Sequence, residues 1–146
     1  MKIGIANDHR GLSLKIYIVN YLKEKRIEYV NYGTDSTDSV DYPDYAAVLC
    51  DPILAGEIDA GIIICGTGIG VSIACNKIKG IRCAKTCNAT EAALARAHND
   101  ANVLALSGHI DKKLAIDIVT EFLETRYTND ERHINRLNKI KDLEGK

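Results

Sequence analysis

The sequence predicts an α/β fold in which helices cover a five-stranded parallel sheet. Short runs rich in β-branched residues alternate along the chain with helical patterns, which is the signature of βαβ units. One of these runs, residues 60–65, is apolar throughout, as in a central parallel strand that is covered on both faces. The length of 146 residues is a common size for one domain. We therefore predict a single domain spanning residues 1–146.

The first half of the chain predicts three strands and two helices. Leu14, Ile18 and Leu22 recur at helical spacing after the first strand, and Pro43 fits the first turn of the second helix. Residues 33–41 are rich in Thr, Ser and Asp and are expected to form a loop. In chain order, the predicted elements are a strand over residues 2–6, a helix over 12–25, a strand over 28–32, a helix from 43 to about 56, and a strand over 60–65.

The second half continues the alternation and ends in two helices. Glycines at 66–70 turn the chain from the buried strand into a helix, and Thr90 and Asp111 are residue types that cap helix N-termini. The predicted elements are a helix from 70 to about 78, a strand over 82–86, a helix from 90 to about 98, a strand over 103–106, a helix from 111 to about 125, and, after a polar loop over 127–131, a helix over 132–143.

Composition excludes several classes of partner. The formal net charge is -1 with no block of like charge, so nothing in the charge pattern favours nucleic acid or an anionic membrane surface. No apolar run approaches the roughly 20 residues of a membrane span, and no signal peptide is visible. The five cysteines are odd in number and lack C-x-x-C spacing, so we expect reduced thiols in the cytoplasm rather than a zinc site.

The functional site is expected where the carboxyl ends of the parallel strands meet. The glycine-rich turn from Cys65 to Gly70 lies there, and backbone N–H groups exposed by such a turn bind anions. Val71 stands where a dinucleotide fingerprint requires glycine, and the Gly-Lys-Ser/Thr of a Walker loop is absent. A tight strand-to-helix turn with no ligand is the alternative, since glycine's permissive backbone is enough to explain it.

Cys65 is the candidate catalytic residue. The amides and the helix that follow it favour a thiolate, which could abstract a proton next to a carbonyl while the amides stabilise the enediolate oxygen. From position alone, a buried bystander thiol explains Cys65 equally well.

Other polar residues have a structural and a functional interpretation. Asp8 and His9 follow the first strand and could form only a turn, and His98 could be a helix C-cap. Arg132 and Arg136 lie at i and i+4 on one helix face, which suits either solvent exposure or bidentate phosphate capture.

The order of these features resembles one enzyme family along nearly the whole chain. The resemblance is carried by KIGIANDHRG at the start, DYPDYA from Asp41, ICGTGIGVSIACNK from Ile64, HNDANVLAL from His98, and RHINR from Arg132. These stretches are similar to those of the ribose-5-phosphate isomerase B and galactose-6-phosphate isomerase family. The third and fourth stretches together are specific to it.

The resemblance implies an aldose-ketose isomerase that interconverts ribose 5-phosphate and ribulose 5-phosphate without a metal or cofactor. It implies a Rossmann-like three-layer sandwich and a homodimer, or a dimer of dimers, with a C-terminal helix used in dimerisation. Each site would take His98 and Asn99 from the neighbouring subunit. The implied catalytic residues are Cys65 as base, Thr67 for proton transfer between the sugar oxygens, His98 for ring opening, and Asp8. The implied substrate-binding residues are His9, Arg132 and Arg136 at the phosphate, Gly66, Gly68, Ile69 and Gly70 at the enediolate, Asn99 at the hydroxyls, and Tyr42 and His109 in the pocket.

Three departures bear on substrate preference. Many members of the family carry Arg where this chain has His109. Position 10, which is Arg10 here, is more often a small or apolar residue in the family, and the loop over residues 127–131 lacks the glycines found in relatives.

Three alternative functions stay open. They are an isomerase of six-carbon sugar phosphates such as allose 6-phosphate or galactose 6-phosphate, a non-catalytic phospho-ligand module that uses the glycine turn alone, and a redox protein that uses Cys83 and Cys87.

Overall fold

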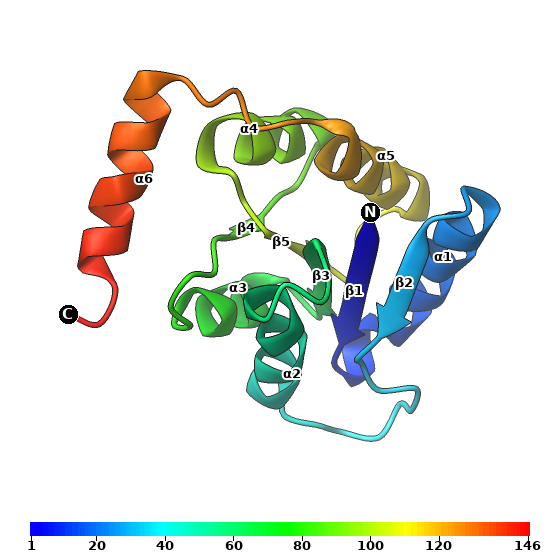
Figure 1. Cartoon of the computed structure of the whole chain (residues 1–146). Helices are drawn as coiled ribbons and strands as arrows, with labels where there is room; N and C mark the ends of the chain where they lie inside the picture. Colours follow the sequence, from blue (N-terminus) through cyan, green and yellow to red (C-terminus); the bar gives the residue numbers. More distant parts are fainter.

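A computed structural model describes all residues from Met1 to Lys146. All five strands are parallel and lie in the order β2-β1-β3-β5-β4 (Figure 1). The strands are β1 (Lys2–Asn7), β2 (Glu28–Asn31), β3 (Ala60–Cys65), β4 (Cys83–Lys85) and β5 (Val103–Ser107). The helices are α1 (Leu12–Glu24), α2 (Tyr42–Leu54), α3 (Ile69–Asn76), α4 (Ala89–Asn99), α5 (Lys112–Glu124) and α6 (Glu131–Leu143), with a short 3-10 turn η1 (His9–Gly11) before α1.

Strand β3 is the centre of the sheet, as its apolar run predicts. It pairs with β1 on one side and β5 on the other, and all six of its residues are buried. Alternate side chains therefore supply two cores. Ile62 and Ile64 belong to the core beneath α1, α4 and α5, whereas Ile63 and Cys65 belong to the core beneath α2 and α3.

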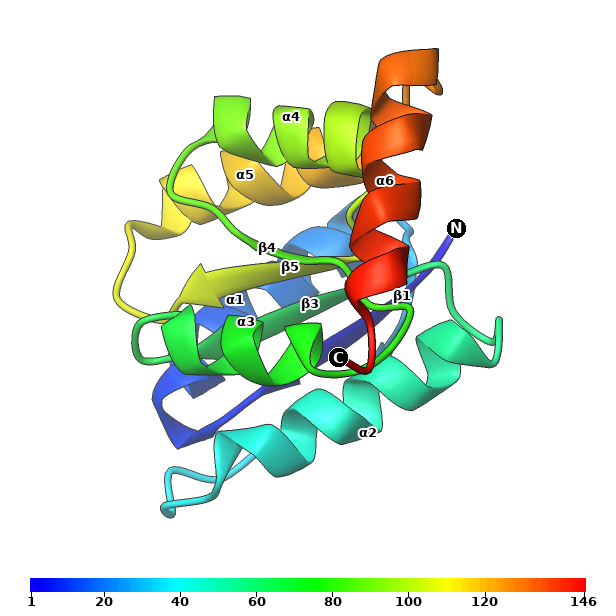
Figure 2. The same cartoon turned by 90° about the vertical axis from the view of Figure 1, so that its left-hand side faces the viewer.

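The two cores make a three-layer sandwich with the sheet in the middle (Figures 1 and 2). Helix α6 stands at the side of this sandwich, beside the edge strand β4, and its contacts within the chain are chiefly with α4 (Figure 2). Several of its apolar side chains are left in solvent, among them Ile140 at 44% and Leu143 at 63% exposure. The fold contains no helix that is both apolar enough and long enough to cross a membrane.

The predicted order of strands and helices is confirmed, with corrections at the ends of elements. The cap of α4 is Asn88, whose side chain accepts a hydrogen bond from the Glu91 amide, so the prediction of Thr90 as the cap is wrong. Asp111 caps α5 as predicted by accepting from the Leu114 amide at 3.0 Å. Strand β4 is shorter than predicted because only residues 83–85 pair with β5, at the edge of the sheet.

Candidate active site

The ends of β1, β3 and β5 meet at one edge of the sheet and are tied together there. The Asp8 amide donates to the Ile64 carbonyl at 3.0 Å, and the Gly108 amide donates to the Cys65 carbonyl at 2.8 Å. The Ser107 hydroxyl donates to the Gly66 carbonyl at 2.7 Å. These bonds hold the three loops in one arrangement, so the side chains on them share a site.

The glycine turn directs an N–H group at the Cys65 sulfur. The Gly68 amide donates to Cys65 Sγ at 3.2 Å, and Gly68 can do so because its backbone is left-handed, with φ of 75°. This contact holds the sulfur at the head of the turn, next to the N-terminus of α3.

Cys65 is nearly covered in a single chain, with 4% of its surface exposed. Cys65 lines none of five surface grooves with volumes of about 270–470 Å³. On the outer side of the turn, the Tyr42 ring lies so close to Gly70 that a Cβ there would be 2.6 Å from Tyr42 Cζ. Tyr42 therefore lies against the glycine turn, and Thr67 is exposed on the same turn.

Asp8 and His9 are held at the end of β1. Asp8 is buried, and its Oδ1 accepts a hydrogen bond from the Arg10 backbone N–H at 2.9 Å, which fixes the start of η1. His9 Nδ1 accepts the Val40 amide at 3.2 Å, so the neutral ring carries its proton on Nε2. His109 lies on the neighbouring loop, is exposed, and donates its amide to Ser107 Oγ.

The remaining predicted site residues lie at the opposite edge of the sheet. Helix α4 begins after the carboxyl end of β4 and runs back before β5 starts, which brings His98 and Asn99 to the amino edge. The His98 ring stacks on the His133 ring of α6 with centroids 4.3 Å apart. Arg132 and Arg136 are exposed on the same helix. One chain therefore divides the predicted residues into two groups that do not meet.

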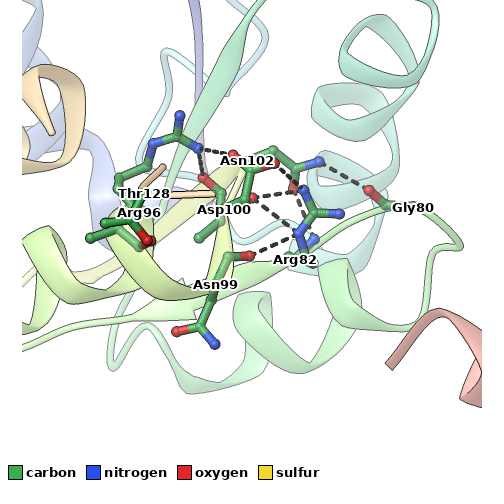
Figure 3. A network of polar contacts seen from close by, with 9 residues as sticks. Gly80, Arg82, Arg96, Asn99, Asp100, Asn102 and Thr128 are labelled. Carbon is green, nitrogen blue, oxygen red and sulfur yellow. Dashed lines mark hydrogen bonds and ion pairs between the residues drawn. The ribbon is translucent and has the colours of Figure 1, made fainter. Parts of the chain in front are cut away.

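A network around Asp100 fixes the end of α4 (Figure 3). Arg82 donates to the carbonyls of Asn99 and Asp100 and pairs with the Asp100 carboxylate at 3.0 Å, and Arg96 pairs with its other oxygen at 3.2 Å. Asp100 is left-handed, with φ of 43°. The network satisfies the last carbonyls of the helix, so it holds His98 and Asn99 in place.

His133 is buried to 4% exposure, and its Nε2 has no hydrogen-bond partner. Desolvation lowers the pKa of His133, and the positive charges of His98 and Arg132 lower it further. A neutral His133 ring can stack on His98 without repelling a proton there. The sequence contains both histidines, but nothing in their spacing indicates the stack.

The other cysteines do not extend the site. All five are free thiols; Cys50 and Cys75 are buried, and Cys83 is partly buried. The pKa of Cys50 is raised, first by a hydrogen bond with Cys75 and then by burial, so Cys50 is an inert thiol. Cys87 is exposed and accepts the Lys85 ammonium at 3.0 Å. No group of three or more Cys, His, Asp or Glu side chains is arranged to hold a metal ion.

Comparison with known proteins gives one consistent result. Residues 3–140 match the family described as Ribose/Galactose Isomerase. A putative sugar phosphate isomerase of Bacillus subtilis is 45% identical, over 100% of this chain and 99% of its own length. Ribose-5-phosphate isomerase B of Escherichia coli is 42% identical, over 98% of this chain and 96% of its own.

Solved structures agree with the sequence relatives. Ribose-5-phosphate isomerase B of Clostridium thermocellum superposes with a TM-score of 0.95 at 44% identity, covering 98% of this chain and 97% of that one. The enzyme of the same name from Mycoplasma genitalium, solved with bound ribulose-5-phosphate, superposes with a TM-score of 0.90 at 42% identity, covering 97% and 94%.

Proposed function

Because this chain belongs to the ribose/galactose isomerase family, we propose that it interconverts ribose 5-phosphate and ribulose 5-phosphate through an enediolate. The observation that carries the proposal is the Gly68 amide donating to Cys65 Sγ at the head of the glycine turn. The relatives named ribose-5-phosphate isomerase B support the substrate, and one of them was solved with ribulose-5-phosphate.

Cys65 is the base in this mechanism. Its thiolate takes the proton from C2 of the open-chain aldose, the electron pair forms the C1–C2 double bond, and the carbonyl oxygen becomes the enediolate oxygen. Backbone N–H groups of the glycine turn stabilise that oxygen, with those of Gly66 and Gly70 available for it, because the Gly68 amide faces Cys65 Sγ and the Ile69 amide donates to Thr67 Oγ1. Thr67 passes a proton between O1 and O2, and the Cys65 thiol returns its proton to C1. The amides and the cationic side chains supply the positive potential, so the step assigns no role to a metal.

A second copy of the chain supplies the other half of the site. His98 and Asn99 lie at the far edge of the sheet from Cys65, and α6 presents exposed apolar residues next to them. We assign a homodimer in which α6 packs on the partner and carries Arg132 and Arg136 to the phosphate beside His9. His98 of that copy opens the furanose ring, with Asp8 and Asn99 holding hydroxyls. The free thiols fit a reducing compartment such as the cytoplasm.

Isomerisation of ribose 5-phosphate in the presence of a chelator tests the reaction. Wild type should turn over, and Cys65→Ala should lose exchange of the C2 proton while it still binds the sugar phosphate. A Cys65→Ala variant with wild-type turnover would show that another group is the base. Faster turnover on allose 6-phosphate or galactose 6-phosphate would move the assignment to the six-carbon branch.

Mixing two inactive variants tests the shared site. Cys65→Ala retains His98, and His98→Ala retains Cys65, so a mixed dimer has one complete site. Random reassociation makes half of the dimers mixed and should restore about a quarter of wild-type activity. No recovery after verified subunit exchange would place both residues in separate sites. Mixing Cys65→Ala with Cys65→Ser is the control and should restore nothing.

A further inference from the structure

A groove of about 400 Å³ lies beside the Cys65 turn and has no acidic residue in its lining. It runs between η1, the first turns of α1 and the start of α5. Its cationic or donor side chains are His9, Arg10 and Lys112, and the rest of its lining includes Ser13, Asn20 and Thr37. A groove of this composition attracts an anion.

Arg10 connects this groove to the glycine turn. Its side chain lies against Gly66, where a Cβ would be 3.0 Å from Arg10 Cδ and 3.9 Å from Nη1. Its backbone is equally confined, since a Cβ on Gly108 would be 2.5 Å from the Arg10 carbonyl oxygen. Two glycines therefore make room for Arg10, and the guanidinium stands at the edge of the turn that carries Cys65.

The guanidinium has no carboxylate of its own. None of the ion pairs of the chain includes Arg10 or Lys112. The buried Asp8 carboxylate is close, but it accepts the Arg10 backbone amide through Oδ1. Lys112 lies over the Tyr17 ring at 5.6 Å from its centroid, which holds its ammonium at the groove. Both charges are thus free to pair with a ligand.

We propose that Arg10 is a specificity-determining residue that binds the phosphate of the substrate, with Lys112 adding to the positive potential of the same groove. The proposal rests on the proposed function and extends it to residues of the groove. The phosphate fits better than the enediolate oxygen because Arg10 shares the groove with His9, whose Nε2–H is a donor, and because the backbone amides of the glycine turn are already assigned to the enediolate oxygen. A guanidinium binds phosphate with two parallel hydrogen bonds, which an ammonium cannot do.

Steady-state kinetics of Arg10→Ala and Arg10→Lys test this assignment, with Lys113→Ala as the control. Lys113 is exposed beside Lys112 but lies outside the groove lining, so its loss removes one positive charge without removing a contact. Losing a charge-assisted hydrogen bond should raise KM for ribose 5-phosphate about tenfold to a hundredfold in Arg10→Ala while kcat stays within about twofold. Arg10→Lys should recover part of the loss, and Lys113→Ala should match wild type.

Binding of inorganic phosphate, followed by calorimetry, separates this proposal from the proposed function. Arg10→Ala should weaken phosphate binding by the same factor as it raises KM, even in a background of Cys65→Ala that cannot turn over. Unchanged phosphate affinity, or a fall in kcat at constant KM, would overturn the assignment. A wild type that binds phosphate through Arg10 but isomerises no sugar phosphate would instead refute the proposed function alone. Circular dichroism and thermal unfolding check that each variant is folded.

Discussion

Replacing Gly68 by alanine should damage both the stability of the fold and the chemistry of Cys65. Gly68 has φ of 75°, and a Cβ there would lie 2.8 Å from the Leu106 carbonyl carbon and 3.1 Å from the Ser107 nitrogen. A left-handed alanine costs roughly 1–2 kcal/mol, and overpacking costs about 1–3 kcal/mol. We expect a loss of about 2–5 kcal/mol in the free energy of unfolding, because the obstructing atoms belong to the backbone of a central strand and cannot rotate away.

Gly56 offers a matched control. Its φ is 72°, almost that of Gly68, but no atom lies within 4 Å of the place a Cβ would occupy. Gly56→Ala should therefore lose only the roughly 1–2 kcal/mol of unfolding free energy that an alanine costs in a left-handed backbone conformation. The difference between the two variants isolates the contact with β5.

Urea unfolding at one protein concentration measures the loss of unfolding free energy in both variants. The rate of alkylation by iodoacetamide measures the reactivity of the Cys65 sulfur. Moving the Gly68 amide removes its hydrogen bond to Sγ, so alkylation at neutral pH should slow in Gly68→Ala and stay unchanged in Gly56→Ala. Because Cys87 is exposed, the rate must be read at the Cys65 peptide by mass spectrometry. Equal stability losses in the two variants, with equal alkylation rates, would refute the close packing of the turn on β5.

Three further predictions concern residues outside the turn. Asp100→Ala removes the acceptor shared by two arginines and should cost about 1–2 kcal/mol in urea unfolding, whereas Asp100→Asn, which tolerates the left-handed backbone, should cost less; equal costs would contradict the role of the backbone. The pKa of His133 is lowered in the folded protein, so the unfolded protein binds more protons at this residue. The stability contributed by the neutral, buried His133 is therefore complete above the ordinary histidine pKa of ~6.5 and is lost as pH falls below that value. His133→Phe, which keeps the ring stack with His98, should flatten the dependence of stability on pH in that range. An unchanged pH dependence would show that His133 does not cause the loss of stability. The pKa of Asp35 is lowered chiefly by its hydrogen bond with Lys15, so the stability that this pair contributes should vanish only as pH falls below the ordinary carboxyl range, and Asp35→Asn should remove that dependence in acid unfolding experiments.

Local patterns in the sequence were enough to predict the order of the elements. The uninterrupted apolar run of β3 and the helical spacing in α1 each reflect contacts that a whole segment makes with its neighbours. Such contacts produce a recognisable pattern of apolar residues in the sequence. The glycine turn was predictable for a similar reason, since its three glycines mark a backbone that needs unusual dihedral angles or close approach.

The contacts that complete the candidate site produce no such pattern in the sequence. Arg82 reaches Asp100 across 18 positions of the chain, and His98 meets His133 from a different helix. Arg10 is marked in the sequence only as a departure from the family's usual residue, and its contact with the glycine turn follows from how its side chain lies against Gly66. Each of these depends on how two elements are oriented, which periodicity does not specify.

The division of the predicted residues between two edges of one sheet is the strongest argument for a second copy. Strand β5 has five residues, so at about 3.3 Å per residue the edges lie roughly 16 Å apart, with packed side chains between them. A single pentose phosphate cannot contact Cys65 at one edge and His98 at the other. Either the two groups serve unrelated purposes, or a two-fold axis brings the His98 edge of one chain to the Cys65 edge of the other and does so twice. The stacked histidines and the Asp100 network favour the second choice, because they hold His98 rigidly at a surface where this chain alone gives it nothing to act on.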